Sequence, residues 1–205
     1  GLDTVQALVL TVHVFSQFTL THGSRFNMDR LWEASMETGS LARAIAKAEQ
    51  APALVIDQSY TAGLLHDVGM LVLAANVQAR YEATLKTAHE RGIPLWEVER
   101  QEFGASHAEI GANLLGLWGL GDSIVEAVTF HHHPSDCVGN TFSPLTAVHV
   151  ANVLQQELSQ QATGGIPSQI DFTYLDKIHM TNRLPHWREV AGAAQRADEK
   201  EKANG

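Results

Sequence analysis

The chain has 205 residues, of which 44% are hydrophobic and 18% charged, and its formal net charge at pH 7 is −9. This length suffices for one sizeable core, so we expect one compact domain with loose ends. An acidic chain without a lysine or arginine cluster is a poor match for nucleic acid, and no apolar run approaches the roughly 20 residues of a membrane span.

Apolar residues recur at spacings of three and four through most of the chain, which predicts an all-α domain. The first helix is predicted over residues 4–19 and the second over residues 28–49, before Pro52 breaks the pattern. Because the amphipathic pattern is under way at Val5 and residue 1 is not methionine, we expect the chain to start inside a larger protein.

The third predicted helix, over residues 57–75 with Asp57 as its N-cap, contains His66 and Asp67 side by side in an apolar run. Unpaired polar groups in a protein interior cost several kcal/mol, so this imidazole and this carboxylate must have partners. A metal ion is one such partner, and a hydrogen-bonded core pair is the alternative.

Further helices are predicted over residues 80–91, ended by Gly92, and over residues 95–102. Ser106 and Glu109 have the spacing of a capping box, so a helix should begin there with His107 in its first turn. Ser123 and Glu126 repeat that spacing. In the helix expected to follow, one inward stripe should contain Ile124, Val128, His131 and His132, and Pro134 should end it.

The last long core helix is predicted over residues 145–158 and a surface loop over residues 163–168. A C-terminal helical piece should then seal the core, and residues 191–205 should form a polar, exposed tail. The single cysteine, Cys137, excludes an intramolecular disulfide and fits a reducing compartment. We therefore expect a soluble protein of the cytoplasm.

Five residues on three predicted helices could converge in the core of such a bundle: His66, Asp67, His107, His131 and His132. Each one alone has an ordinary explanation as a core pair, a surface residue or a solvated helix end, but their combination favours a shared polar cluster. Imidazoles with a carboxylate suit Zn, Fe, Mn or Ni without a thiolate. Such a divalent ion could activate a water molecule for attack on phosphorus.

Four segments of the chain carry a family resemblance. They are AGLLHDVG at residues 62–69, EFGASHAEIGA at 102–112, LWGL at 117–120 and AVTFHHHP at 127–134. In this order and spacing they resemble the HDOD family, a branch of the HD phosphohydrolase superfamily, over about residues 1–190. The resemblance implies an all-helical HD-like bundle in a bacterial cytoplasmic signalling protein.

The resemblance also implies a domain organisation and partners. Residues 1–24 would be the end of a truncated upstream helical part, residues 25–190 the HD-like core and residues 191–205 the tail. Members are commonly fused to receivers or other signalling modules, so signalling proteins or domains are the expected partners, with no nucleic acid and no membrane. A homo-oligomer is compatible with this interpretation.

The superfamily's catalytic pattern is broken at two positions. By this resemblance, catalytic HD enzymes have their first metal-binding histidine at the position of Ala34. They have their distant metal-binding aspartate at the position of Asn152. The resemblance therefore implies that the primary metal site is lost. Asp67 remains, and with His107, His131 and His132 it matches the second site of the HD-GYP phosphodiesterases, although the Gly-Tyr-Pro signature is absent.

Two functions follow from this pattern. The first is a regulatory or output module in bacterial signal transduction, with a degenerate HD metal site and no catalysis. The alternative is a metal-dependent phosphohydrolase that acts on a nucleotide or phosphoester through the surviving secondary site. The absence of ligands at Ala34 and Asn152 favours the first function.

Overall fold

The structure is a computed structural model that describes residues 26–159 and 166–204, with side chains described as far as residue 196. The predicted helix over residues 4–19, and the region 1–24 as a whole, lie outside the described residues. Within the described ranges the chain forms helices and no strand, so the prediction of an all-α fold is confirmed.

The helices follow one another with short connections. The α-helices are α2 (Met28–Ala48), α3 (Ala53–Leu65), α4 (Val68–Asn76), α5 (Gln78–Arg91), α6 (Leu95–Phe103), α7 (His107–Leu117), α8 (Asp122–Phe130), α9 (Pro144–Ser159), α10 (Phe172–Lys177) and α11 (Leu184–Asn204). Two short 3₁₀ helices, η1 (Pro134–Asp136) and η2 (Thr181–Arg183), lie beside α10.

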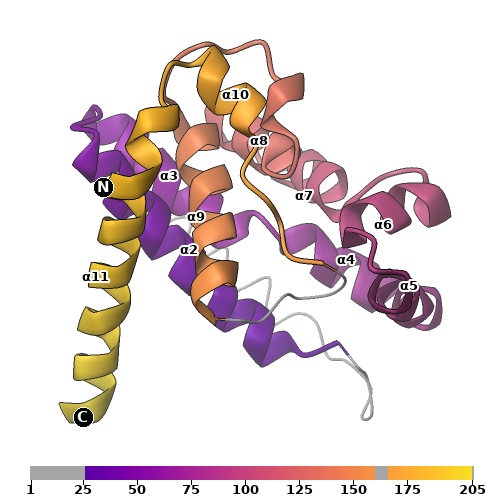
Figure 1. The fold of residues 1–205 in the computed structure, drawn as a ribbon. Coiled ribbons are helices and arrows are strands. Elements are labelled where there is room, and N and C mark those ends of the chain that lie inside the picture. Colours follow the sequence, from indigo (N-terminus) through magenta and orange to yellow (C-terminus); the bar gives the residue numbers. More distant parts are fainter. Residues whose placement is uncertain (1–25, 160–165, 205) are drawn as a thin grey trace.

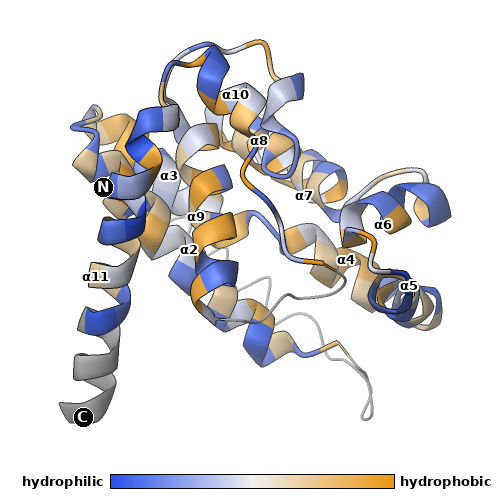
Figure 2. Ribbon diagram, in the orientation of Figure 1, coloured by the Kyte–Doolittle hydropathy of each residue, from blue (hydrophilic) through white to orange (hydrophobic). Residues whose placement is uncertain are grey.

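The helices are arranged in two halves joined by α8. Helices α2, α3, α9 and α11 pack together in one half, and α4, α5, α6 and α7 form the other (Figure 1). Helix α8 contacts α7 on one side and α3 and α9 on the other. Helices α4 and α9 are mostly apolar, whereas hydrophilic residues dominate α5 and α11 (Figure 2). Most residues of α4 and α9 are buried, so these two helices lie in the interior, although α9 also contains buried polar side chains such as His149 and Asn152.

The predicted helix over residues 57–75 is two helices, and His66 and Asp67 lie in the turn between them. Helix α3 begins at Ala53 directly after Pro52, so Asp57 lies inside the helix and is not its N-cap. Helix α4 begins after Asp67, which occupies the N-cap position. Hydrophobic periodicity could not reveal this break, because residues 61–71 on both sides of the turn are all buried and the apolar run continues through it.

A close contact between backbones brings α4 and α7 together. A Cβ atom at Gly69 would lie 2.0 Å from the carbonyl oxygen of His107 and 2.8 Å from the amide nitrogen of Gly111. Only the hydrogen atom of glycine fits in this space. The crossing places the turn that contains Asp67 next to the first turn of α7, which contains His107.

Local capping chemistry agrees with the sequence at α7 and differs at α8. The capping box of Ser106 and Glu109 is formed and α7 starts at His107. Helix α8 starts at Asp122 after an extended Gly121, so the box expected at Ser123 is not used. Helix α8 also ends at Phe130, so His131 and His132 follow it in a turn rather than continuing its inward stripe.

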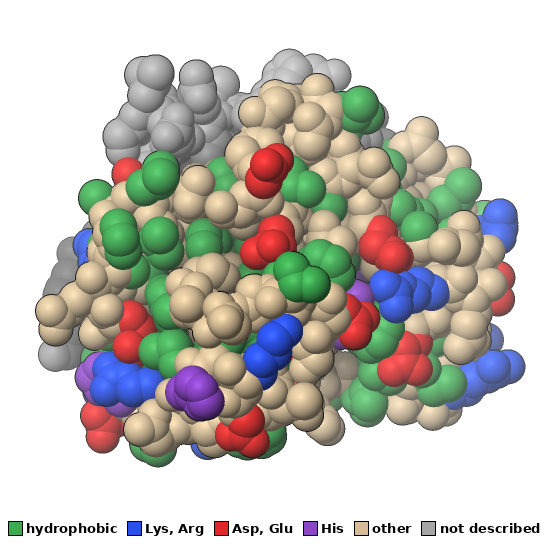
Figure 3. Space-filling view, turned by 90° about the horizontal axis from the view of Figure 1, so that it is seen from above, with side chains coloured by type: hydrophobic (Ala, Val, Ile, Leu, Met, Phe, Trp, Pro, Cys, Tyr) green, Lys and Arg blue, Asp and Glu red, His purple; other side chains and the backbone are tan. Residues whose placement is uncertain are grey.

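At the C-terminal end, α11 continues to Asn204 and so includes residues 191–204, for which the sequence predicts a polar, exposed tail. The division into residues 1–24, 25–190 and 191–205 stays a prediction. In the part of the chain that the structure describes, no helix has the length and apolar character needed to cross a bilayer. On the face seen in Figure 3, acidic and basic side chains are scattered among apolar ones rather than gathered in a basic stripe.

Candidate metal centre

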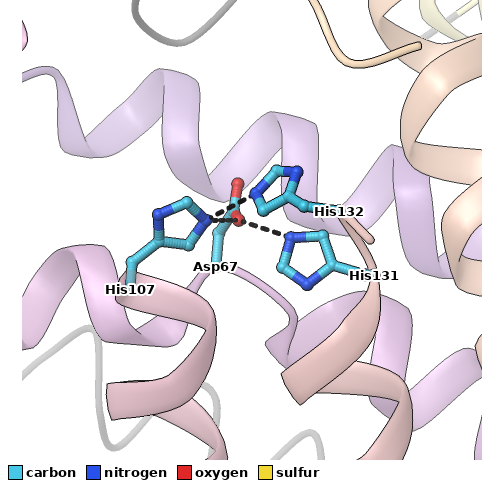
Figure 4. Close-up of side chains that lie close together, drawn as sticks. All are labelled: Asp67, His107, His131 and His132. Atoms are coloured by element: carbon cyan, nitrogen blue, oxygen red, sulfur yellow. Dashed lines mark hydrogen bonds and ion pairs between the residues drawn. The ribbon is translucent and has the colours of Figure 1, made fainter. Parts of the chain in front are cut away.

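Four of the five predicted ligands meet at one point in the interior. Asp67 comes from the turn between α3 and α4, His107 is the first residue of α7, and His131 and His132 follow α8 (Figure 4). One ligand atom from each residue can be chosen so that all four lie within 4.8 Å of one another. Residues from three separate parts of the sequence, with up to 65 positions between them, thus form one cluster, as predicted from their order.

Short distances around Asp67 define this cluster. Asp67 Oδ1 lies 3.2 Å from His107 Nε2 and 3.6 Å from His131 Nε2. The Nε2 atoms of His107 and His132 are 2.9 Å apart. All three histidines therefore direct the same ring nitrogen towards a common centre.

The opposite nitrogen of each ring is held by a different partner. Nδ1 of His107 lies 2.6 Å from a carboxylate oxygen of Glu99, and Nδ1 of His131 lies 2.8 Å from the Val128 carbonyl oxygen. Nδ1 of His132 lies 3.3 Å from the Ser168 hydroxyl. A ring nitrogen that donates to a carbonyl or carboxylate leaves the other nitrogen free to bind a cation.

Unsatisfied buried atoms indicate that a cation fits this centre. Asp67 Oδ1 and His131 Nε2 are buried and make no hydrogen bond. Such groups are costly in a protein interior, and a carboxylate oxygen facing imidazole nitrogens is a donor set that Zn, Fe, Mn and Ni accept. Asp67, His107, His131 and His132 are thus the residues that would hold a metal.

Electrostatic interactions within the cluster shift the pKa values of its members. Burial lowers the pKa of His131 to about 4, so its ring is neutral near pH 7. Burial also lowers the pKa of His107, but Glu99 and Asp67 outweigh it and raise the value to about 10. Burial raises the pKa of Asp67, yet His66, His107 and His131 hold it well below its ordinary value. A metal would replace the proton that His107 otherwise keeps.

His66, the fifth predicted ligand, lies beside the cluster and outside the set of four. Its Nδ1 is 2.8 Å from the Gly63 carbonyl oxygen, and its Nε2 is 3.2 Å from the second oxygen of Asp67. Its ring meets that of His131 edge-on, with 5.1 Å between the ring centres. His66 therefore orients the Asp67 carboxylate through Oδ2, the oxygen that does not face His107 and His131.

The two positions that lack superfamily ligands have other surroundings. Ala34 lies on α2 and offers no donor atom. Asn152 on α9 accepts from Gln156 Nε2 at 2.9 Å and donates to Ser168 Oγ at 3.5 Å, while the Ser168 backbone N–H donates to Gln156 Oε1 at 2.7 Å. Asn152 thus belongs to a hydrogen-bonded ring that holds the segment next to His132. His149, one turn before it, has backbone partners for both ring nitrogens and is a core histidine.

A cavity of about 220 Å³ opens beside the centre. Its wall includes Asp67, His107 and His132, with polar groups from Gln156, Ser168 and Gln169 and apolar groups from Met70, Leu95, Trp96 and Ile166. Neither lysine nor arginine is among its described lining residues, and residues 160–165 contain none in the sequence. Among the residues that the structure describes, no lysine or arginine therefore lies on the cavity wall, and its cationic group is the protonated His107 ring.

No motif in the sequence marks the residues that contact the ligands from the side away from the metal centre. Glu99 lies in the helix predicted over 95–102, and Ser168 and Gln156 belong to a predicted loop and a core helix. Trp96 stacks near His132 and His133, with ring centres 6.1 and 5.2 Å away. Their positions follow from packing between distant segments. The only hint in the sequence is that Glu99 lies on the apolar side of its helix, one residue after Val98 and four residues after Leu95.

Comparison with known proteins places these features in a family. The family model described as HDOD domain matches residues 1–134. An uncharacterized protein of Treponema pallidum (strain Nichols) is 32% identical over 133 residues, which are 65% of this chain and 25% of that protein. The matched part thus spans about a quarter of that relative.

Solved structures share the fold over nearly the whole chain. An HDOD domain protein of unknown function from Geobacter sulfurreducens has a TM-score of 0.76 at 21% identity, covering 99% of this chain and 70% of its own. A candidate phosphohydrolase from Shewanella amazonensis SB2B has a TM-score of 0.69 at 22% identity, and the match covers 94% of this chain and 69% of that one. A candidate signal transduction protein from Marinobacter aquaeolei VT8 has a TM-score of 0.70 at 19% identity, and the match covers 98% of this chain and 43% of that one. At these identities the likeness concerns the fold.

Proposed function

Because the chain belongs to the HDOD family, we propose that it is a regulatory module of bacterial signal transduction that binds one metal ion and does not catalyse a reaction. Asp67, His107, His131 and His132 would hold the ion. Bound there, the ion would supply a permanent cross-link between the turn before α4, the start of α7 and the end of α8.

One observation carries this proposal: four donor atoms converge within 4.8 Å, while the two further superfamily positions are Ala34 and Asn152. A site for a second ion is therefore not supported. Zinc sites with four protein ligands are mostly structural, whereas catalytic ones keep three ligands and leave a position for water. Three histidines and Asp67 would supply four protein ligands, the number typical of a structural site.

The charge balance of the centre also argues against phosphoester chemistry. The Asp67 and Glu99 carboxylates would neutralise the two positive charges of a divalent ion. A phosphoester would add negative charge to a cavity whose described lining contains no lysine or arginine. Phosphoryl-transfer sites stabilise that charge with additional cations or metal ions.

Signalling partners follow from the family and its neighbours. The structural neighbour from Marinobacter aquaeolei is named as a candidate signal transduction protein and is more than twice as long as the part that matches. We infer that this chain acts on signalling proteins or domains, a receiver upstream of residue 1 among them. Output through protein contacts needs no substrate site.

A second candidate function is a metal-dependent phosphohydrolase acting on a nucleotide or phosphoester. The observation in its favour is that three of the four ligands, Asp67, His107 and His132, reach the wall of the cavity of about 220 Å³. The Shewanella amazonensis neighbour is named as a candidate phosphohydrolase. An ion with more than four coordination positions could hold a water molecule on this side.

Metal content and hydrolysis together test the proposal. The full chain is purified without chelator, and its metal is measured beside that of the His107→Ala, His131→Ala double variant. We expect one ion per chain in the wild type and its loss in the double variant. A screen of nucleotides and model phosphodiesters with added Mn²⁺ or Fe²⁺ should give no hydrolysis above the double variant.

The control is His89→Ala, because His89 is an exposed histidine on α5 outside the centre. This variant should keep its metal. A wild-type chain without metal would refute the metal-binding module. Hydrolysis that disappears in the double variant, but not in His89→Ala, would instead establish the phosphohydrolase.

A further inference from the structure

Glu99 is a completely buried carboxylate directly behind one candidate ligand. Its Oε2 atom accepts a hydrogen bond from the His107 backbone N–H at 2.7 Å and lies 2.6 Å from His107 Nδ1. Its Oε1 atom accepts from the Tyr81 hydroxyl at 3.1 Å. Burying a carboxylate costs several kcal/mol unless such donors compensate, so the fold holds this anion at one defined place.

The three candidate histidines differ in what holds them. His131 faces a backbone carbonyl and His132 a serine hydroxyl, both of which are neutral. Among the described contacts of these rings, only His107 Nδ1 has a carboxylate from outside the cluster. A carboxylate in this position fixes the tautomer of a ligating histidine and strengthens its other nitrogen as an electron donor.

We propose that Glu99 is the positioning residue of the metal centre. It keeps a proton on His107 Nδ1 and so presents the Nε2 lone pair to the ion. Because Oε2 of Glu99 contacts both the ring and the backbone N–H of His107, it also fixes the ring relative to the start of α7. This inference rests on the proposed function, since it requires that the centre binds a metal.

A purely structural role for Glu99 makes a different prediction. The backbone N–H of His107 is one of the unpaired groups at the start of α7, where an anion is favoured by the helix dipole. If Glu99 served only as this cap, its loss would lower stability without changing the affinity for a metal. The matched control is therefore Glu109→Gln, which weakens the capping box of the same helix without touching a ligand.

The experiment measures Zn²⁺ affinity of the metal-free full chain by competition with a chromophoric chelator. Glu99→Gln should weaken binding by about 10- to 100-fold, the usual effect of losing such a partner. Glu109→Gln should lower the midpoint of unfolding and leave Zn²⁺ affinity unchanged. Equal affinity of Glu99→Gln and wild type would overturn the inference while leaving the proposed function intact.

A second measurement needs no variant, so it applies even if Glu99→Gln fails to fold. In the Zn²⁺-loaded wild type, ¹⁵N NMR of the histidine side chains should place the His107 proton on Nδ1 and zinc on Nε2. The reverse assignment would refute the role of Glu99. A wild-type chain that binds no Zn²⁺ would refute the proposed function, and this inference with it.

Discussion

At the residue scale, Asn152 has a clear structural use at the position where the family resemblance predicts an aspartate ligand in catalytic HD enzymes. Its amide both accepts from Gln156 and donates to Ser168, which a deprotonated aspartate at this position could not do. The ring of hydrogen bonds among Asn152, Gln156 and Ser168 holds residues 166–171 in place. Asn152 thus helps to anchor this segment beside His132, a role for which its neutral amide is needed.

Asp171 gives a pH-dependent prediction for that segment. Its carboxylate accepts from the backbone N–H groups of Tyr174 at 2.9 Å and Ser135 at 3.2 Å, capping α10 and tying it to η1. Burial raises the pKa of Asp171, but the nearby Ser135 hydroxyl and the two backbone N–H groups outweigh burial and lower the pKa below 3.8. The resulting stability is present above 3.8 and is lost as the pH falls through the lowered pKa.

We therefore expect Asp171→Ala to reduce the free energy of unfolding by about 1 kcal/mol near neutral pH, as for other lost N-caps. Urea unfolding of both proteins at a series of pH values measures the difference. It should shrink as the solution is acidified below the ordinary aspartate pKa. A difference that stays constant into acid would show that the charge of Asp171 does not contribute.

At the element scale, the sequence predicted helices best where local chemistry marks their ends. Ser106 and Glu109 mark the start of α7, and Gly92 ends α5 in a left-handed conformation. The break at His66 and Asp67 has no such mark, because tertiary packing of α4 on α7 imposes it. The box at Ser123 was a misleading mark, since Gly121 and Asp122 already begin α8 one residue earlier.

The crossing of α4 and α7 leads to a prediction about Gly69. Replacement by alanine would put Cβ 2.0 Å from the His107 carbonyl oxygen, so the two helices must move apart. We expect Gly69→Ala to lower the free energy of unfolding by about 1–3 kcal/mol, as overpacking does, and to abolish metal binding because Asp67 and His107 separate. Chemical unfolding and metal content measure these effects.

Gly116→Ala, on the same helix α7, is the control, because a Cβ there meets no atom within 4 Å. This variant should be neutral or up to about 1 kcal/mol more stable, since alanine favours a helix interior over glycine. It should also keep its metal. Equal stability and metal content in the two variants would mean that the close crossing does not set the geometry of the centre.

At the scale of the whole molecule, the candidate centre lies where the two halves of the fold meet. Asp67 and His107 belong to the half formed by α4 to α7, and His131 and His132 follow α8, which packs on α3 and α9. The order of motifs in the sequence was enough to predict that these four residues cluster. The roles of Glu99 and Ser168 could not be predicted, because only the tertiary fold brings these residues next to the Nδ1 atoms of His107 and His132.

A metal at this junction should stabilise the whole fold rather than one helix. An ion that binds the folded state alone adds about 2.7 kcal/mol at a free concentration 100 times its dissociation constant. For a chain of this size, that corresponds to a rise in the unfolding temperature of roughly 5–11 °C. We expect Zn²⁺ to produce one such shift, in a single cooperative transition followed by circular dichroism, and the His107→Ala, His131→Ala variant to show none. A temperature shift of equal size in that variant would mean that the stabilising ion binds elsewhere. A second unfolding transition whose temperature does not change with Zn²⁺ would mean that the centre does not join the two halves.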